Sequence, residues 1–334
     1  MELMRNRNGE TEVKEQRVMD GADKRKTVDV IIPVYRPGKS FKELLRRLRE
    51  QEYPIRRLMI MNTEKSFWKP EYEKAFREDS EGPEMEVHHL LKDEFDHGGT
   101  RDRGARLSGA DICLFMTQDA VPRDRYLVGN LVKALEGGED IAAAYGRQLP
   151  FEDCSVIETY TRSFNYPKES RIKSKADLPQ LGIKTYFCSN VCAAYRMEIY
   201  RELGGFIRHT IFNEDMIYAS KAVQAGYKIA YAADAEVFHS HNYTAIEQLH
   251  RNFDLAVSQT DHPEAFEGIR SEGEGIRLVK KTAVFLIKQG KWYLLPRLAV
   301  QSGFKYLGYC LGKRYKKLPK GLVLHLTMNR NYWR

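Results

Sequence analysis

Short apolar runs and amphipathic segments alternate along the first half of the chain. The apolar runs have the length and composition of buried strands and cover residues 28–34, 58–61, 85–91, 112–116 and 141–145. Between them, apolar side chains fall at helical spacing over residues 41–48, over residues 71–77 and from about Arg123 onward. This alternation predicts an α/β fold in which helices flank both faces of a mostly parallel sheet.

The pattern is less regular after residue 150. Residues 151–182 are polar and contain Pro167 and Pro179, a composition that suits either a mobile loop near a site or a solvent-exposed insertion. Strand character resumes over residues 186–195. Asn213 is then expected to cap a helix that runs to about residue 225 and ends at Gly226. The remaining elements expected in the body are strands over residues 229–231 and 236–239 and a helix over residues 244–257.

The net charge of +8 is unevenly distributed. Residues 276–334 contain 14 Lys or Arg and no Asp or Glu, which leaves 40 basic and 46 acidic side chains in the rest of the chain. A slightly acidic body therefore precedes a basic segment. Apolar and aromatic residues recur in that segment at roughly helical spacing, which predicts a basic amphipathic helical extension. Residues 1–26 are charged, show little periodicity and are expected to form a disordered tail.

Cysteine usage and the lengths of the apolar runs bear on location. Five cysteines at irregular spacing indicate reduced thiols and a cytoplasmic protein. Cys188 and Cys192 lack a second pair at metal-ligand spacing, so no zinc site is expected. No N-terminal run has the apolar core of a signal peptide, and none approaches the ~18 apolar residues of a membrane span.

A glycine-rich segment carries the first candidate chemistry. Gly98 and Gly99 can adopt positive φ and let backbone N–H groups approach a ligand, and Thr100 can cap the helix whose first turn carries Arg101. Asp119 follows the strand over residues 112–116, at the sheet edge where α/β proteins bind ligands. These groups suit a phosphorylated ligand held partly through a metal ion. A capped helix followed by an ordinary strand and turn would give the same pattern.

Three further groups are candidates for the same sheet edge. Pro33, Val34 and Tyr35 end the first strand, where an aromatic side chain and a bend can receive a nucleobase, although proline also simply ends strands. The second group is Asn213, Glu214 and Asp215, which opens a helix and offers a carboxylate as general base, although acidic side chains also commonly complement helix N-termini. The third group is His239 and His241, which offer two imidazoles on one face of a strand as metal ligands, although close histidines are often structural.

Together these segments resemble the family 2 glycosyltransferases of the GT-A fold, and within them the bacterial rhamnosyltransferase-like group. The resemblance covers about residues 27–260 and implies a domain over residues 27–275, with a donor half (27–150) and an acceptor half (151–275). Five ordered motifs carry it: VIIPVYRPG (30–38), FDHGGTRDRGA (95–105), FMTQDAVP (115–122), ELGGF with NEDMIYASKAVQAGYKIAY (202–206 and 213–231) and VFHSHNYT (237–244).

The resemblance also implies roles for individual residues. Asp119 would hold Mg²⁺ or Mn²⁺ against the donor diphosphate, with His239 as the expected ligand from the last motif and His241 in reserve. Asp215 would take the proton from the acceptor hydroxyl, with Glu214 in reserve. The implied donor-binding residues are Pro33, Val34, Tyr35, Asn62, Gly98, Gly99, Arg101 and Gln118.

Two departures from the family pattern affect these expectations. Asn62 stands where the family usually has Asp, which removes a charged contact to the base or ribose. Thr117-Gln118-Asp119 keeps one carboxylate of the family's Asp-x-Asp motif. Because Mg²⁺ commonly binds through one or two carboxylates plus substrate phosphates, one carboxylate can suffice, with weak metal affinity in the absence of nucleotide.

The resulting expectation is an inverting glycosyltransferase. It would move a sugar, L-rhamnose from dTDP-rhamnose in the first place, to a hydroxyl of a growing, lipid-linked cell-surface polysaccharide. Residues 276–334 would attach the protein peripherally to the anionic inner face of the cell membrane, unless they form helices packed on the body with a solvated basic face. A UDP-hexose donor is the alternative within the fold. Alternatives outside it are a non-catalytic nucleotide-sugar-binding protein and a nucleic-acid-binding protein, the latter opposed by the acidic body.

Overall fold

A mixed sheet forms the centre of the molecule. The computed structural model describes residues 25–77, 82–269 and 272–334. Within these residues a nine-stranded sheet has the order β3-β2-β1-β4-β8-β6-β9-β5, with β7 also paired to β9. The strands are β1 (Val28–Tyr35), β2 (Arg57–Thr63), β3 (Glu84–Leu90), β4 (Ile112–Met116), β5 (Val121–Pro122), β6 (Ile141–Leu149), β7 (Arg171–Lys173), β8 (Cys192–Arg196) and β9 (Lys228–Phe238).

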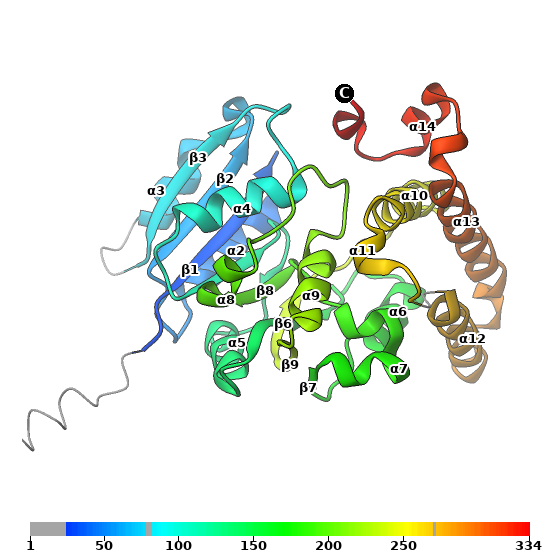
Figure 1. Ribbon diagram of the computed structural model, residues 1–334, viewed down its shortest axis with the longest axis horizontal. Coiled ribbons are helices and arrows are strands. Elements are labelled where there is room, and N and C mark those ends of the chain that lie inside the picture. Colours follow the sequence, from blue (N-terminus) through cyan, green and yellow to red (C-terminus); the bar gives the residue numbers. More distant parts are fainter. Residues whose placement is uncertain (1–24, 78–81, 270–271) are drawn as a thin grey trace, which may run out of the picture.

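Helices surround the sheet and continue beyond it (Figure 1). The α-helices are α2 (Lys39–Arg49), α3 (Pro70–Arg77), α4 (His97–Leu107), α5 (Leu127–Glu136), α6 (Val156–Asn165), α7 (Leu178–Leu181), α8 (Met197–Glu202), α9 (Glu214–Gln224), α10 (Ala245–Asp261), α11 (Pro263–Phe266), α12 (Glu272–Lys288), α13 (Leu295–Lys313) and α14 (Lys320–Leu326). Short 3-10 helices are η1 (Lys65–Phe67), η2 (Lys175–Asp177), η3 (Gly182–Tyr186), η4 (Trp292–Leu294), η5 (Tyr315–Lys317) and η6 (Arg330–Trp333).

The α/β fold expected from the pattern is confirmed, but the sheet is evenly mixed. The pairs β1–β2, β2–β3, β1–β4 and β6–β9 are parallel. The pairs β4–β8, β6–β8, β5–β9 and β7–β9 are antiparallel. Strand β8 lies between β4 and β6 and runs against both, so the parallel arrangement is interrupted in the middle of the sheet.

Two apolar layers cover the two faces of the sheet. Alternate residues of β1 separate between them, because successive side chains of a strand point to opposite faces. Val30 and Ile32 pack with helices α2, α3 and α5, which contribute residues such as Phe41 and Leu131. Ile31 belongs to the opposite layer, with residues of α4, α8 and α9. The carboxyl ends of β1 and β4 therefore emerge from a rigid core, and the residues that follow them are held in fixed positions.

The second half departs from the local pattern in three places. Residues 151–182, expected to be irregular, contain helix α6 and strand β7. The strand expected over residues 186–195 is shorter, because η3 ends at residue 186 and β8 begins only at residue 192. The two short strands expected near residues 229–239 form the single strand β9, whose register against β6 shifts between Gly146 and Arg147.

The C-terminal segment is helical, as expected, and packs on the body. Helix α13 lies along α10, and the stacked rings of Tyr160 and Phe285 join α6 to α12 with centroids 4.5 Å apart. Figure 1 shows α12 and α13 on the side of the molecule away from β1–β3. Within the described residues, none of the helices has the length and apolar character needed to cross a membrane. The disordered tail predicted for residues 1–26 lies almost entirely outside the described residues.

Candidate active site

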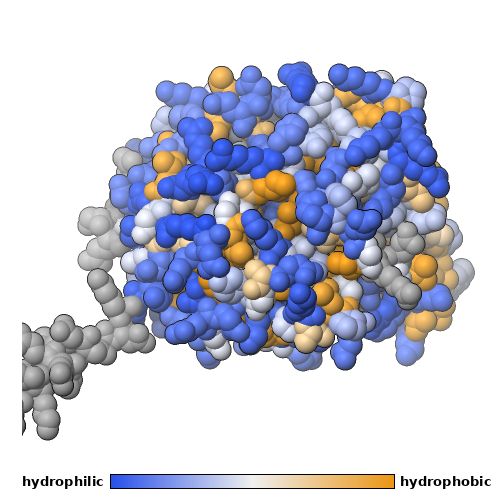
Figure 2. Space-filling model, in the orientation of Figure 1, coloured by the Kyte–Doolittle hydropathy of each residue, from blue (hydrophilic) through white to orange (hydrophobic). Residues whose placement is uncertain are grey.

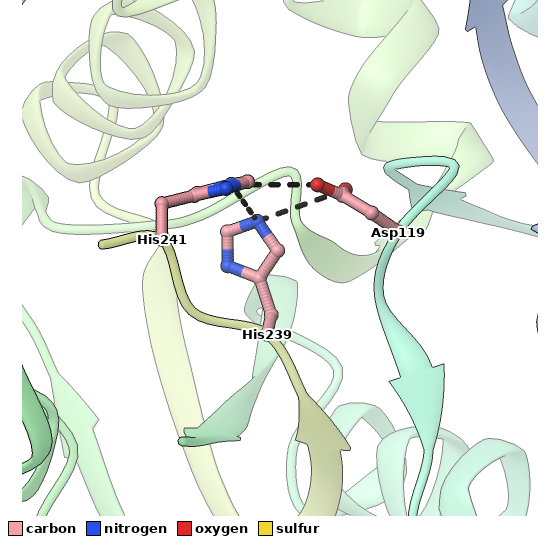
Figure 3. A group of neighbouring side chains, drawn as sticks. All are labelled: Asp119, His239 and His241. Carbon is pink, nitrogen blue, oxygen red and sulfur yellow. Dashed lines mark hydrogen bonds and ion pairs between the residues drawn. The ribbon is translucent and has the colours of Figure 1, made fainter. Parts of the chain in front are cut away.

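Asp119, His239 and His241 meet at one edge of the sheet (Figure 3). Asp119 lies between β4 and β5, and the two histidines follow the end of β9. His241 Nε2 lies 3.1 Å from His239 Nε2 and 3.3 Å from the Asp119 carboxylate, and one ligand atom from each residue falls within 4.8 Å of the others. Two imidazoles and one carboxylate converging in this way form a donor set suited to a divalent cation.

The environment of the histidines keeps them available as ligands. Gln148 Oε1 lies 3.0 Å from His239 Nδ1, so His239 Nε2 is left facing Asp119 and His241. A second hydrogen bond that orients a ligating imidazole in this way is a common feature of metal sites. Burial lowers the pKa of His239 to about 3 and also lowers the pKa of His241. Both rings are therefore neutral near pH 7, the form in which imidazole binds a metal.

Gln118 fixes the loop that ends β1. Its amide accepts a hydrogen bond from Tyr35 N at 2.9 Å and donates one to Tyr35 O at 3.0 Å. This reciprocal pair joins the segment before Asp119 to the predicted base pocket, where Pro33 and Val34 lie within β1. Phe67 packs edge-on against Tyr35, and the Arg36 guanidinium lies 4.4 Å from the Phe67 ring centroid. Gln118 thus has a positioning role in this structure, and its predicted contact with the donor stays a prediction.

Asn62 is buried at the end of β2 with part of its amide unsatisfied. Its Nδ2 lies 3.0 Å from His89 Nδ1 and donates to Glu64 O at 3.3 Å. Its Oδ1 is buried and has no hydrogen-bond partner among the described residues. An unpaired buried acceptor carries a desolvation cost, so this oxygen is available for a donor group. The predicted role of Asn62 in nucleotide binding has no direct test in the structure.

The glycine-rich segment has a different geometry from the one expected. Helix α4 begins at His97, and its N-cap is Asp96, whose side chain accepts from Gly99 N at 2.7 Å; the cap predicted at Thr100 is therefore wrong. Neither Gly98 nor Gly99 has a positive φ. The Asp96 carboxylate also accepts from the backbone N–H groups of residues 209 and 210 at 2.8 and 3.0 Å. Gly98 allows close packing, because a Cβ there would collide with the backbone at residue 207.

Glu214 and Asp215 lie at the start of α9 in distinct environments. Glu214 Oε1 lies 3.1 Å from Arg101 NH1, and both side chains are only 7% exposed. Asp215 accepts from Asn190 N at 3.0 Å and Met216 N at 2.7 Å. The Arg101 guanidinium, expected to face donor phosphates, is thus paired with a carboxylate of the chain. Asn213 is the N-cap residue as expected, but it has a φ of 65° and makes no side-chain capping bond.

The two carboxylates differ in protonation. Burial alone would raise the pKa of Glu214, but the charge of Arg101 and a hydrogen bond from Asn190 Nδ2 hold it below its usual value. Burial and the neighbouring charge of Glu214 raise the pKa of Asp215 to about 7. Glu214 is therefore a fixed anion. Asp215 is a partly exposed carboxylate that exchanges a proton near neutral pH, the property required of a general base.

Arg251 on α10 connects the two clusters and was not anticipated from the sequence. Its guanidinium lies 4.7 Å from the ring centroid of Phe212 and 5.7 Å from that of Tyr243. The Tyr243 ring lies 5.1 Å from that of His241, and the Phe212 ring 6.3 Å from that of His97 beside Glu214. The only local signal was a basic residue in an amphipathic helix, and such residues are too common to single out.

Solved structures show the class of fold. The mannosyltransferase PcManGT from Pyrobaculum calidifontis, in complex with GDP-Man and Mn²⁺, superposes with a TM-score of 0.55 at 16% identity, over 97% of this chain and 90% of that chain. Residues 1–349 of S. aureus TarS superpose with a TM-score of 0.52 at 15% identity, over 87% of this chain and 91% of that chain. At these identities the likeness establishes a shared GT-A fold.

Sequence comparisons establish the family. The model of glycosyl transferase family 2 matches residues 29–204. The O-antigen chain rhamnosyltransferase RfbN of Salmonella typhimurium is 39% identical over 311 residues, which cover 92% of this chain and 96% of RfbN. The O-antigen chain rhamnosyltransferase WbaN of Salmonella anatum is 42% identical over 244 residues, covering 72% of this chain and 76% of WbaN. The chain belongs to glycosyltransferase family 2, so the expected enzyme class is confirmed.

Proposed function

We propose that this enzyme is an inverting rhamnosyltransferase that transfers L-rhamnose from dTDP-rhamnose to a hydroxyl of a growing, lipid-linked cell-surface polysaccharide. The identity of the sugar rests on RfbN and WbaN, which are both named O-antigen chain rhamnosyltransferases. The observation that carries the mechanism is the presence of a candidate cation site and a candidate general base in one fold. No nucleic-acid partner is required by this account.

The cation site takes Mn²⁺ or Mg²⁺ in this proposal. Asp119 and His239, with His241, would hold the ion, and two nitrogen ligands favour Mn²⁺ over Mg²⁺, which prefers oxygen. The chemistry that such an ion supplies when bound is stabilisation of negative charge on the diphosphate leaving group. Because Asp119 is the one carboxylate that is retained, we expect the affinity for the ion to depend on bound nucleotide.

The proton transfer is assigned to Asp215. In a single displacement, the acceptor oxygen forms a bond to the anomeric carbon while the bond from that carbon to the diphosphate oxygen breaks. The acceptor hydroxyl then loses its proton to the Asp215 carboxylate, and the configuration of the anomeric carbon inverts. Glu214 supports this step without touching the proton, because its charge keeps the pKa of Asp215 close to 7.

An exposed apolar surface on α12, η4 and α13 supports attachment to a membrane. Trp292 and Tyr293 are 68% and 61% exposed at the turn between the two helices. Figure 2 shows apolar side chains at the right-hand edge of the molecule, where Figure 1 places α12 and α13. Basic residues surround this surface, and each one near an anionic leaflet contributes ~1 kcal/mol. The further residues of the surface are Ile276, Lys280, Val284, Ile287, Lys288, Lys291, Arg297 and Val300.

The proposal is tested by donor turnover. The purified enzyme is incubated with bacterial membranes that carry the lipid-linked acceptor and with dTDP-rhamnose, UDP-glucose, UDP-galactose or GDP-mannose, each with and without Mn²⁺. The expected result is acceptor-dependent release of dTDP, faster than release of any other nucleotide. Preferential turnover of a UDP-hexose would overturn the proposed donor, and the absence of transfer from every donor would overturn the proposed activity.

A further inference from the structure

A stripe of small residues places Lys305 of the C-terminal extension beside the start of α10. A Cβ at Gly308 would collide with Leu249 O, and one at Gly312 with Phe253 O, so this face of α13 contacts α10 with the two helices running in the same direction. Lys305 lies one turn before Gly308 on the same face, because residues three apart are neighbours on a helix surface. It therefore lies level with the first turn of α10, which directly follows the His241 segment.

Two arginines from the body lie near the same place. Arg251 is on α10 with its guanidinium between the rings of Phe212 and Tyr243. Arg162 on α6 contacts Gln148, which in turn contacts the ligand candidate His239. Arg162 and Arg251 act electrostatically on both His239 and His241, and Lys305 lies within electrostatic reach of the two arginines. Cationic side chains from three helices that are far apart in the sequence therefore gather beside the metal-ligand cluster.

The three cationic side chains have fewer acidic partners than they have positive charges. Glu158 is bound to Arg162 at 2.8 Å. Among the described residues, Arg251 and Lys305 have no hydrogen bond or ion pair with an acidic group, and both side chains are partly buried. Burial lowers the pKa of Lys305, with Glu158 opposing the shift and Arg251 and Arg162 adding to it. In the part of the chain that the structure describes, Glu158 is thus the one carboxylate paired with any of the three cations, and an anionic ligand would stabilise the other two.

We propose that Lys305, Arg251 and Arg162 bind a phosphoryl group of a substrate next to the Asp119–His239–His241 cluster, so that the C-terminal extension completes the active site. Phosphate oxygens fit this set because Arg and Lys both donate charge-assisted hydrogen bonds to them. Two sources can present such a group: the diphosphate of the nucleotide-sugar donor and a phosphate that links the acceptor glycan to its lipid. The choice of these two sources rests on the proposed function, whereas the binding of an anion at this place does not.

The test uses full-length protein with Lys305→Met, which removes the charge and keeps most of the aliphatic stem. Lys305→Arg restores a cation, and Lys313→Met removes an exposed charge further along the same helix as a matched control. Circular dichroism and thermal melts establish that all variants fold. Isothermal titration calorimetry without divalent metal then gives the Kd for inorganic pyrophosphate, for dTDP and for a short-chain polyprenyl diphosphate dispersed in detergent.

The expected result is a roughly tenfold rise in the Kd for pyrophosphate in Lys305→Met, with near-normal binding in Lys305→Arg and Lys313→Met. If Lys305→Met also raises the Kd for dTDP but not that for the polyprenyl diphosphate, the site belongs to the donor. If it raises the Kd for the polyprenyl diphosphate but not that for dTDP, the site belongs to the acceptor. Unchanged pyrophosphate binding in Lys305→Met would overturn the proposal, as would an equal loss in Lys313→Met. If pyrophosphate binding depends on Lys305 while no rhamnose is transferred, the anion site stands and the proposed function fails.

Discussion

Replacement of Asp215 by Asn is the most informative single change in this enzyme. Asn keeps the size of the side chain and one of its two acceptor oxygens, so the bonds from Asn190 N and Met216 N are only partly lost. What disappears is the ability to take a proton. Loss of a general base typically lowers the rate by ~10²–10⁴, which corresponds to about 3–5 kcal/mol of transition-state stabilisation.

The pH dependence of wild-type turnover gives a second measure. Burial and the Glu214 charge raise the pKa of Asp215 to about 7, so the carboxyl retains its proton below that pH and is an active base above it. We therefore expect kcat/KM to rise roughly tenfold per pH unit up to about pH 7 and then to level off. In Asp215→Asn this rise should be absent and the residual rate should vary little over the same range.

Glu214→Gln separates the base from its neighbour. Without the Glu214 charge, the pKa of Asp215 falls, so the midpoint of the pH profile moves to lower pH while a rising limb persists. The same change leaves Arg101 without its partner in a buried pair, which typically costs about 3–5 kcal/mol of unfolding free energy. Values of kcat/KM from initial rates at subsaturating acceptor between pH 5 and 9, together with urea unfolding, measure both effects. If Asp215→Asn keeps near-full activity while Glu214→Gln loses it, the assignment of the base is wrong.

Three further predictions concern the metal ligands, the membrane surface and the glycine-rich segment. His239→Ala should remove the stimulation of transfer by Mn²⁺ and reduce Mn²⁺ binding in the presence of dTDP, measured by electron paramagnetic resonance; unchanged Mn²⁺ binding would exclude His239 as a ligand. Trp292→Ser should reduce co-sedimentation with phosphatidylglycerol vesicles severalfold. Leu91→Ser changes an equally exposed apolar residue outside the α12–η4–α13 surface and should have no such effect. Equal effects of the two changes would argue against membrane binding by that surface. Gly98→Ala should lower the free energy of unfolding by ~1–3 kcal/mol in urea titrations because its Cβ collides with the backbone at residue 207, and an unaltered midpoint would refute this packing role.

The sequence was most informative where local pattern and sheet topology agree. The strands over residues 28–35 and 112–116 are nearly where the apolar runs place them, because buried strands need continuous apolar residues. Since β4 and β9 both carry candidate residues at their carboxyl ends, the sheet-edge argument brings Asp119 and His239 together, and the structure has them in contact. The general rule about strand ends was sufficient there because β5, which directly follows Asp119, pairs with the end of β9.

Contacts between residues that are distant in sequence could not be predicted. Arg101 pairs with Glu214, more than a hundred residues later, so its neighbours in the chain give no indication of that contact. The capping bond from Gly99 N to Asp96 is local, but the same carboxylate also binds the loop at residues 209 and 210, a tertiary interaction that local helix-start signals do not contain. Similarly, Arg251 and Lys305 become notable only once α10 and α13 are packed together.

The configuration of the new glycosidic bond tests the central claim most directly. The purified enzyme is incubated with dTDP-rhamnose, the acceptor membranes and Mn²⁺, and the product is released and examined by NMR for the anomeric configuration of the added rhamnose. A single displacement with Asp215 as base predicts that the configuration is inverted relative to the donor and that Asp215→Asn yields little product. Retention of configuration, or undiminished product from Asp215→Asn, would contradict the proposed mechanism.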